Sequence, residues 1–194
     1  MNRARTCIAV ASLACALASK SASADPIALR APLTGRALVG TFGTPEISVG
    51  AWLSDRLGFA FEWRLPTSAV GASVARRWTL VGERMSWGVD LSVATGVVVP
   101  LIAPAGAVSL TPALIGRWRN EYLEVSASLV SPAVFRVLPE PAARLPLLFE
   151  VWIIGHYHQA HLGAQGSVGS VYVTGLSWAY AIQVSGFLGW DLDA

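Results

Sequence analysis

The sequence predicts an all-β protein that folds as an antiparallel up-and-down transmembrane β-barrel, and three observations lead to this fold class. Segments of about ten residues alternate between bulky apolar and small or polar residues, which is the period of a β-strand. The polar positions hold glycine, alanine, serine and isolated charges. Apolar residues make up 54% of the chain and charged residues 13%, against about 45–50% and about 25% in soluble domains. The apolar face is therefore expected to meet lipid, and the small residues a crowded interior.

The segment at residues 86–97 shows the alternation most clearly. One face carries Trp87, Val89, Leu91 and Val93, and the other carries glycine, alanine, serine and Asp90. The segment at 57–65 repeats the pattern with Phe59, Phe61 and Trp63 on its apolar face. We predict that these seven large side chains face lipid.

The first 24 residues have the form of a secretory signal peptide. A basic start is followed by an uncharged stretch too short to span a bilayer, and Ala22-Ser23-Ala24 forms a small-x-small cleavage site. Residues 25–35 are then expected to form an N-terminal periplasmic segment. Both cysteines lie before the cleavage site, so the mature chain is expected to have no disulfide and no thiolate metal ligand. Cleavage leaves 11 basic against 12 acidic residues, a balance that excludes nucleic acid as a partner.

Ten strands are predicted for a barrel domain at 36–192. They lie at 36–43, 46–53, 57–65, 70–81, 86–97, 107–119, 121–130, 147–158, 161–173 and 176–190. The expected turns on one rim are short, whereas the longest connections, 100–106 and the proline-rich 131–146, fall on the opposite rim, as in barrels with both ends in the periplasm. An eight-strand barrel is the alternative, and it would require the loss of two of these segments.

A bundle of membrane helices is the structural rival. Residues 91–116 and 162–190 contain no charged residue and are long enough to span a bilayer. However, the first stretch holds three prolines and the second holds six glycines, which cost about 3 and about 1 kcal/mol each in a helix. The pattern therefore favours strands.

Charged residues on the inward positions predict a closed lumen. The predicted ionic network consists of Glu62, Arg64, Arg77, Asp90, Arg117, Glu124 and Glu150, with Gln183 beside it. Unpaired charges in a dry interior are costly, so these groups are expected to pair across the barrel and fill it. Arg76 and Arg77 are adjacent, so one of them must point outward, and we expect Arg76 near the membrane interface or at a bulge.

All three histidines lie within six residues. His156 and His158 share a strand face and His161 follows a tight turn, so three imidazoles could converge on zinc or another divalent metal. The alternative interpretation is a polar rim at a water interface. No catalytic residue and no cofactor other than this metal is predicted, and the sequence favours a non-enzymatic role.

These features together resemble a bacterial outer-membrane β-barrel at the level of the class. The resemblance implies secretion by the Sec route, insertion by the barrel assembly machinery, contact with outer-membrane lipids and a location in the outer membrane of a Gram-negative bacterium. It also implies a structural, adhesive or surface-interaction role carried by the loops at 100–106 and 131–146.

Two alternative functions remain open. His156, Gln159 and Ala160 are similar to the His-x-Ser-Asn-Ala segment of outer-membrane lipid A deacylases, although His158 stands where that family has its serine. One alternative is therefore a lipid-modifying enzyme or a metal-binding barrel that uses His156, His158 and His161. The other is a secreted, lipocalin-like soluble barrel.

Overall fold

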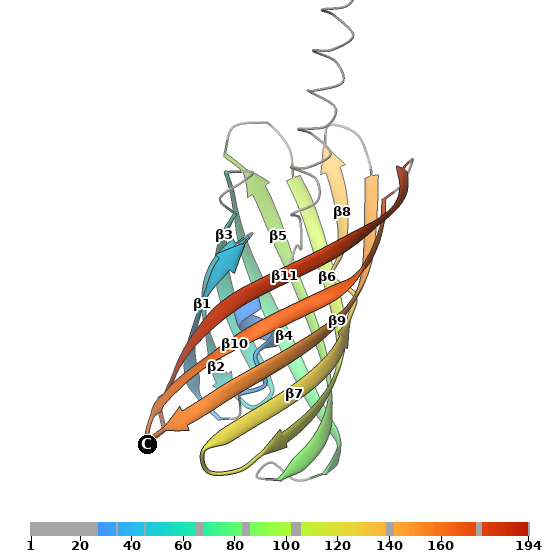
Figure 1. The fold of residues 1–194 in the computed structure, drawn as a ribbon. Coiled ribbons are helices and arrows are strands. Elements are labelled where there is room, and N and C mark those ends of the chain that lie inside the picture. The colour runs from blue at the N-terminus through green and yellow to red at the C-terminus, as the bar shows by residue number, and fades with distance from the viewer. Residues whose placement is uncertain are drawn as a thin grey trace, which may run out of the picture.

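The computed structural model describes residues 27–33, 35–44, 46–64, 68–82, 86–101, 106–138, 142–173 and 176–193. They form one sheet of antiparallel strands that closes into a tilted barrel (Figure 1). The strands are β1 (Ala37–Thr44), β2 (Glu46–Ser54), β3 (Leu57–Arg64), β4 (Ala69–Gly82), β5 (Trp87–Pro100), β6 (Gly106–Arg119), β7 (Leu123–Val130), β8 (Ala133–Leu138), β9 (Ala142–Tyr157), β10 (Ala160–Val173) and β11 (Leu176–Asp191). Within these ranges, no helix is long and apolar enough to cross a membrane.

The barrel closes through pairing of its first and last strands. Ala37 on β1 lies opposite Asp191 on β11, and each remaining strand pairs with its neighbours around the barrel. β7 and β8 occupy one position in succession, because both pair with β6 on one side and with β9 on the other. The predicted antiparallel ten-strand barrel is therefore confirmed.

The prediction of a long loop at 131–146 is wrong. Within it, β8 and the first part of β9 add strand pairing above β7, and Ser131 and Pro132 lie between β7 and β8 (Figure 1). The amide of Ser131 donates to the carbonyl of Pro112, and its hydroxyl donates to the carbonyl of Pro146. Prolines suggested a loop because they lack an amide donor. Pro146 nevertheless lies within β9, and Pro139 and Pro141 are outside the described residues.

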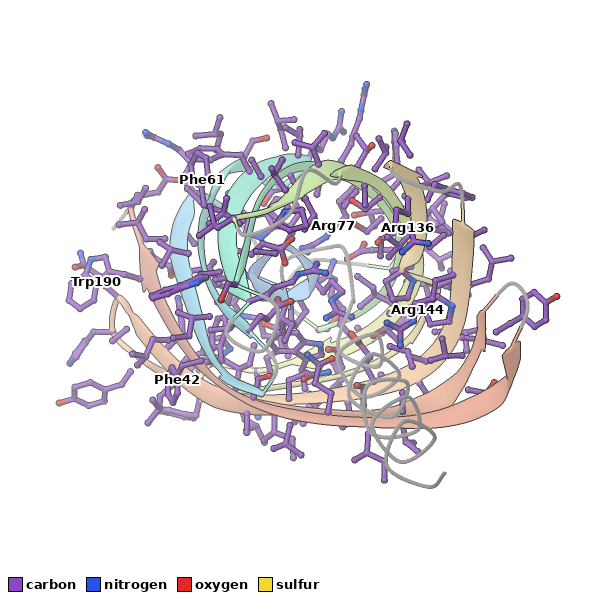
Figure 2. The ribbon with its side chains drawn as sticks, turned by 90° about the horizontal axis from the view of Figure 1, so that it is seen from above. Phe42, Phe61, Arg77, Arg136, Arg144 and Trp190 are labelled. Carbon is purple, nitrogen blue, oxygen red and sulfur yellow. The ribbon has the colours of Figure 1, made fainter. Side chains whose placement is uncertain are left out.

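The outer face of the barrel carries the large apolar side chains. Phe42, Phe61 and Trp190 point away from the interior, whereas Arg77, Arg136 and Arg144 point into it (Figure 2). Exposure alternates along the strands, most regularly in β3. This alternation follows from the pleat, which sends successive side chains to opposite faces.

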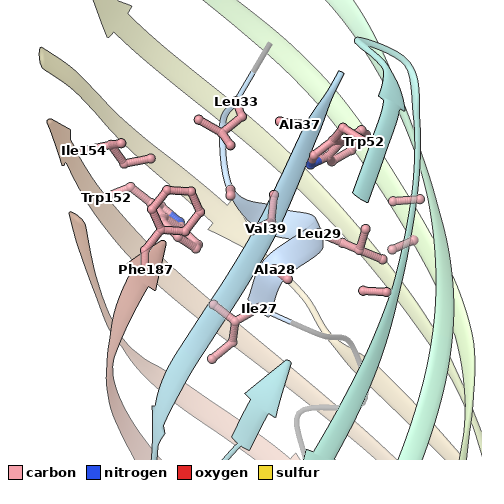
Figure 3. Packing of buried hydrophobic residues seen from close by; sticks show 14 residues of the cluster. Ile27, Ala28, Leu29, Leu33, Ala37, Val39, Trp52, Trp152, Ile154 and Phe187 are labelled. Atoms are coloured by element: carbon pink, nitrogen blue, oxygen red, sulfur yellow. The ribbon is translucent and has the colours of Figure 1, made fainter. Parts of the chain in front are cut away.

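A segment that precedes the first strand occupies the lumen. Residues 27–33 are buried, and they begin with a short 3₁₀ helix, η1 (Ile27–Arg30). Ile27, Leu29 and Leu33 pack within the barrel against Trp52, Trp152 and Phe187 (Figure 3). We call residues 27–33 the plug. The sequence treats residues 25–35 as a segment that precedes the barrel, and the structure instead places the described residues 27–33 inside it.

The number of strands explains why a plug is needed. About eight strands enclose an interior that side chains alone can fill, and ten strands enclose a wider one. Small residues at inward positions leave space for the plug and for the large inward side chains. At Gly58, for example, an added Cβ would lie 2.9 Å from the ring of Trp52 and 3.1 Å from Leu29 of the plug. The apolar residues of the plug were missed because a short segment next to a signal peptide has no periodicity to interpret.

Candidate functional site

The lumen brings together the charged residues that the sequence assigned to it. All seven are buried. The guanidinium of Arg64 contacts the carboxylate of Glu62 at 2.9 Å, and Nε of Arg117 donates to Oδ2 of Asp90, also at 2.9 Å. Each pair satisfies two charges within the barrel, which is the arrangement that a buried ion pair requires.

Polar contacts anchor the plug to the barrel wall. Arg30 of η1 forms an ion pair with Glu150 of β9, and both side chains are almost fully buried. The amide of Ile27 donates to Oε1 of Glu46 at 2.7 Å. Arg30 and Glu46 were absent from the predicted network, because Arg30 lies outside every predicted strand and Glu46 is the first residue of its strand.

Arg77 holds the other end of the plug. Its two terminal nitrogens donate to the carbonyls of Leu33 and Ala31 at 2.8 and 2.7 Å. Its guanidinium also lies 4.1 Å from the ring centroid of Trp52. Leu33 and Ala31 lie outside the strands, so their carbonyl groups need a donor other than a neighbouring strand, and Arg77 supplies it.

The adjacent Arg76 points outward. It lies opposite Leu57, the first residue of β3, and its guanidinium sits 5.2 Å from the ring centroid of Trp78. A β-bulge follows between Thr79 and Val81. Arg76 is therefore level with the β2–β3 turn at the edge of the apolar face.

Two of the three histidines meet inside the rim that carries the short turns. Nδ1 of His156 on β9 lies 2.7 Å from Nδ1 of His161 on β10, and the rings meet edge to face. Their side chains are only 5% and 1% exposed. His158 does not join them, because it lies exposed in the turn with a φ of 52° and packs against the ring of Tyr157.

A carboxylate faces each ring of this histidine pair. Nε2 of His161 lies 2.9 Å from Oδ1 of Asp191 on β11, and Nε2 of His156 lies 3.5 Å from Oε2 of Glu124 on β7. Arg119 approaches the same oxygen of Glu124 at 3.9 Å. The sequence showed no carboxylate for these rings, because Glu124 comes from a distant strand. Strand register was the available signal: His161 lies opposite Gly189, two residues before Asp191.

The geometry does not form the three-histidine metal site that the sequence suggested. Among the described residues, no group of three or more His, Cys, Asp or Glu is placed to hold a metal ion. Nitrogens on one tetrahedral zinc, each about 2.0–2.1 Å from the metal, lie about 3.3 Å apart. The 2.7 Å separation is instead that of a direct hydrogen bond between the rings.

The histidine pair is also far from Ser167, the serine that a deacylase-like site would need. Ser167 lies opposite Glu150, six residues along β9 from His156. At about 3.4 Å per residue this separation is about 20 Å. The similarity to the deacylase segment therefore brings no serine at position 167 to the rings.

The seven predicted lipid-facing residues all lie on the outer face. Phe59, Phe61, Trp63 and Trp87 are exposed, and Val89, Leu91 and Val93 are half-buried. Phe59, Phe61 and Val97 line a shallow apolar groove between β3, β4 and β5.

When the chain is compared with models of protein families, with curated proteins and with solved structures, nothing matches it.

Proposed function

We propose that this protein is a small outer-membrane β-barrel, sealed by its own N-terminal segment, with a structural, adhesive or surface-interaction role. The observation that carries this proposal is the outer face. Every strand position around the barrel contributes exposed large apolar side chains, such as Val49, Leu114 and Ile182. Soluble monomers rarely expose a contiguous apolar patch larger than a few hundred Å², whereas this surface encircles the molecule.

Aromatic side chains support the same conclusion at the rim with the short turns. Five exposed aromatics lie close to strand ends there: Trp87, Trp118, Tyr122, Tyr157 and Trp190. The ten residues of β6 from Trp118 to Val108 span about 34 Å along the strand. If the strand tilts by about 40° from the barrel axis, this length corresponds to about 26 Å along that axis. Membrane barrels have an apolar band of about 25 Å bordered by aromatic girdles.

The same observations disfavour a lipocalin-like soluble barrel. Such a barrel turns polar residues to water and keeps an apolar interior for its ligand. Here the large apolar residues face outward, and the interior holds ion pairs and the plug. The side chains of Trp52, Trp152 and Phe187 at the level of the plug have no exposed surface.

The surface role rests on the rim opposite the short turns. The strands on this rim are connected at residues 45, 65–68, 101–105, 139–141 and 174–175, mostly outside the described residues. The proposed partners are therefore outer-membrane lipids around the belt, the assembly machinery during insertion, and an extracellular ligand at this rim. A sealed lumen supports a role outside the barrel rather than conduction through it.

The membrane location is tested by placing arginine at two heights of the outer face. Leu114 lies midway along β6, and Leu192 lies just after β11 at the rim. In a membrane barrel, Leu114→Arg is expected to cost about 2–4 kcal/mol and Leu192→Arg about 0–1 kcal/mol. In a soluble barrel, neither change buries a charge, so equal small effects would refute the proposal. Urea unfolding in lipid vesicles gives the free energies.

The sealed lumen is tested by conductance. The intact protein in planar bilayers is expected to show no current steps, and a variant that lacks residues 27–33 is expected to show them. Slower gel migration after boiling verifies that each protein was folded. Steady current steps from the intact barrel would contradict the seal.

A further inference from the structure

Part of the last strand has an open edge. β1 pairs with β11 only as far as Thr44, which lies opposite Val184. The next residue in the chain is Pro45, which has no amide proton to donate to a neighbouring strand, and β2 begins at Glu46 and pairs with the other edge of β1. Residues 176–183 of β11 therefore pair with β10 on one edge, and no described strand pairs with their second edge (Figure 1).

The exposure of side chains along β11 agrees with this open edge. Ile182 is 80% exposed. Leu188, which lies on the same strand between β1 and β10, is 51% exposed. A strand on each side shields Leu188, whereas Ile182 is shielded by β10 alone.

Five consecutive residues of the open edge, Ala179–Gln183, keep a regular register. They pair with β10 from Val171 to Ser167, and the irregularity of this pairing lies beyond them, between Val171 and Val173. The five residues include no charge and no proline, which are the residues that commonly block an exposed edge. At about 3.4 Å per residue they extend over about 17 Å, an ordinary length for a strand.

A second open edge, on β4, differs because it is blocked. β4 pairs with β3 only up to Arg76, so residues 78–82 have no described strand on that side. A β-bulge between Thr79 and Val81 breaks this edge, and Gly82 has a φ of 95°. Bulges twist an edge away from further pairing. Residues 179–183 of β11 contain no such bulge, so this edge can accept another strand.

A second copy of the chain is the occupant that fits this edge. Between residues 27 and 193, each segment outside the described residues has four residues or fewer, so none provides a strand of five. The first 24 residues are predicted to be cleaved. A separate peptide would cover the edge but expose an edge of its own. The β11 of a second copy already pairs with its own β10 on its far edge, so joining two copies leaves neither edge open.

We propose that two copies of this protein join by antiparallel pairing of their β11 edges, with a two-fold axis at Ala181. In this register Ala179 of each copy lies opposite Gln183 of the other copy, and Tyr180 lies opposite Ile182. Both pairs combine positions of equal parity, so the inner and outer faces of one strand continue those of the other. The two sheets become continuous through the contact.

The symmetry determines how the two barrels face each other. The two-fold axis is perpendicular to the sheet and therefore to the barrel axis, so the rotation reverses the direction of the barrel. Two barrels inserted in one membrane in the same direction cannot pair in this way, whereas barrels in two facing membranes can. The edge lies in the half of β11 nearer the rim opposite the short turns (Figure 1).

The pairing thus gives the proposed adhesive role a partner, which is the same protein on a facing membrane. A contact of five residues is short, but many copies on each membrane bind together more strongly than one. This adhesive role rests on the proposed membrane location, whereas the strand pairing does not.

Cysteine cross-linking in detergent micelles tests the pairing. Cys7 and Cys15 are replaced by serine, so the parent protein has no thiol. Ala181→Cys places two thiols at the axis, where Cα atoms of opposite residues lie about 4.5–5.5 Å apart, within the range of a disulfide. Leu80→Cys, exposed on the blocked edge of β4, is the matched control. Mild oxidation is expected to link Ala181→Cys into a dimer and to leave Leu80→Cys monomeric. Equal results for the two folded variants would overturn the proposal.

A charge swap at Ile182 tests the register. The two copies of position 182 become diagonal neighbours, about 7–8 Å apart. Ile182→Lys or Ile182→Glu alone places like charges there, and the dissociation constant of the dimer is expected to rise about tenfold. An equal mixture of the two variants is expected to restore the dimer, and Val49→Lys on the outer face of β2 is expected to behave like the wild type. Sedimentation measures all four. A mixture as dissociated as its components would overturn the pairing, and so would a monomeric wild type.

Phosphatidylcholine vesicles separate the pairing from the adhesive role. Vesicles that carry the wild type are expected to aggregate, and vesicles with Ile182→Lys are expected to aggregate only with vesicles that carry Ile182→Glu. Dimers in micelles without aggregation of vesicles would refute adhesion but support the pairing. Failure to insert into lipid would refute the membrane location, and the micelle result would still decide the pairing.

Discussion

The centre and the rim of the lumen solve the problem of buried charge in different ways. At the centre, Arg30–Glu150 and Arg64–Glu62 pair a guanidinium with a carboxylate. At the rim, two imidazoles face two carboxylates. Arginine offers five donors in a planar fork, whereas each imidazole ring has only two nitrogens to share between its neighbours. At the centre each charge is therefore balanced within its own pair, whereas at the rim the two rings also contact each other directly, Nδ1 to Nδ1 at 2.7 Å.

The largest effect is expected when one partner of a central pair is removed. Glu150→Leu leaves the guanidinium of Arg30 buried without its carboxylate, and we expect a loss of about 3–5 kcal/mol in the free energy of unfolding. Arg30→Met combined with Glu150→Leu removes both charges and is expected to regain most of that loss. Urea titration of the two single variants and the double variant measures this. A double variant as unstable as Glu150→Leu would show that the pair is not coupled.

A smaller effect is expected from the apolar part of the plug. Leu29 is fully buried, so Leu29→Ala should leave a cavity and cost about 2–5 kcal/mol, with about 3 as the expected value. Leu114→Ala on the outer face, where the side chain is 47% exposed, is the matched control and should cost clearly less. The same urea titration ranks them. Equal costs would mean that the plug is not tightly packed.

Overpacking next to a central pair comes third. A Cβ added at Gly71 would lie 2.3 Å from Oε1 of Glu62, which Arg64 holds in place. Gly71→Ala is therefore expected to cost about 1–3 kcal/mol. Gly106→Ala meets no atom within 4 Å and is the control. If Gly71→Ala and Gly106→Ala have the same thermal unfolding temperature, the Glu62–Arg64 pair is mobile rather than fixed.

The smallest effect is expected outside the lumen. Arg36 and Asp193 lie 3.3 Å apart with side chains 56% and 53% exposed, so water screens them. Arg36→Ala should change the free energy of unfolding by at most about 1 kcal/mol, and less at high salt. Unfolding at two salt concentrations measures this. A cost close to that of Glu150→Leu would remove the distinction between exposed and buried pairs.

Most of the barrel could be predicted because each strand carries its own pattern. Segments such as 57–65 and 107–119 agree with β3 and β6 to within a residue at each end. The alternation of large and small residues fixes both the strand and the face that turns outward. The prediction failed at 131–146, where prolines were interpreted as a loop. Which backbone groups go unpaired there depends on the neighbouring strands, and a single segment does not reveal this.

The candidate site was predictable only in part, for a related reason. The inward positions of Glu62, Asp90 and Arg117 follow from period 2, but the partner of each charge follows from register. Glu150 meets Arg30 from the plug, and His156 meets Glu124 across 32 residues of sequence. Local pattern carries no information about such distances.

The sequence by itself determined that strands form and which face of each is apolar, because a pleated strand sorts its side chains by parity alone. Closure of the barrel decided what fills the interior and which charged side chains meet. Joining β1 to β11 created an interior wider than side chains could fill, drew residues 27–33 into it, and brought His156, His161, Glu124 and Asp191 to one rim. These contacts exist only once ten strands share one circumference, so no stretch of the chain encodes them alone.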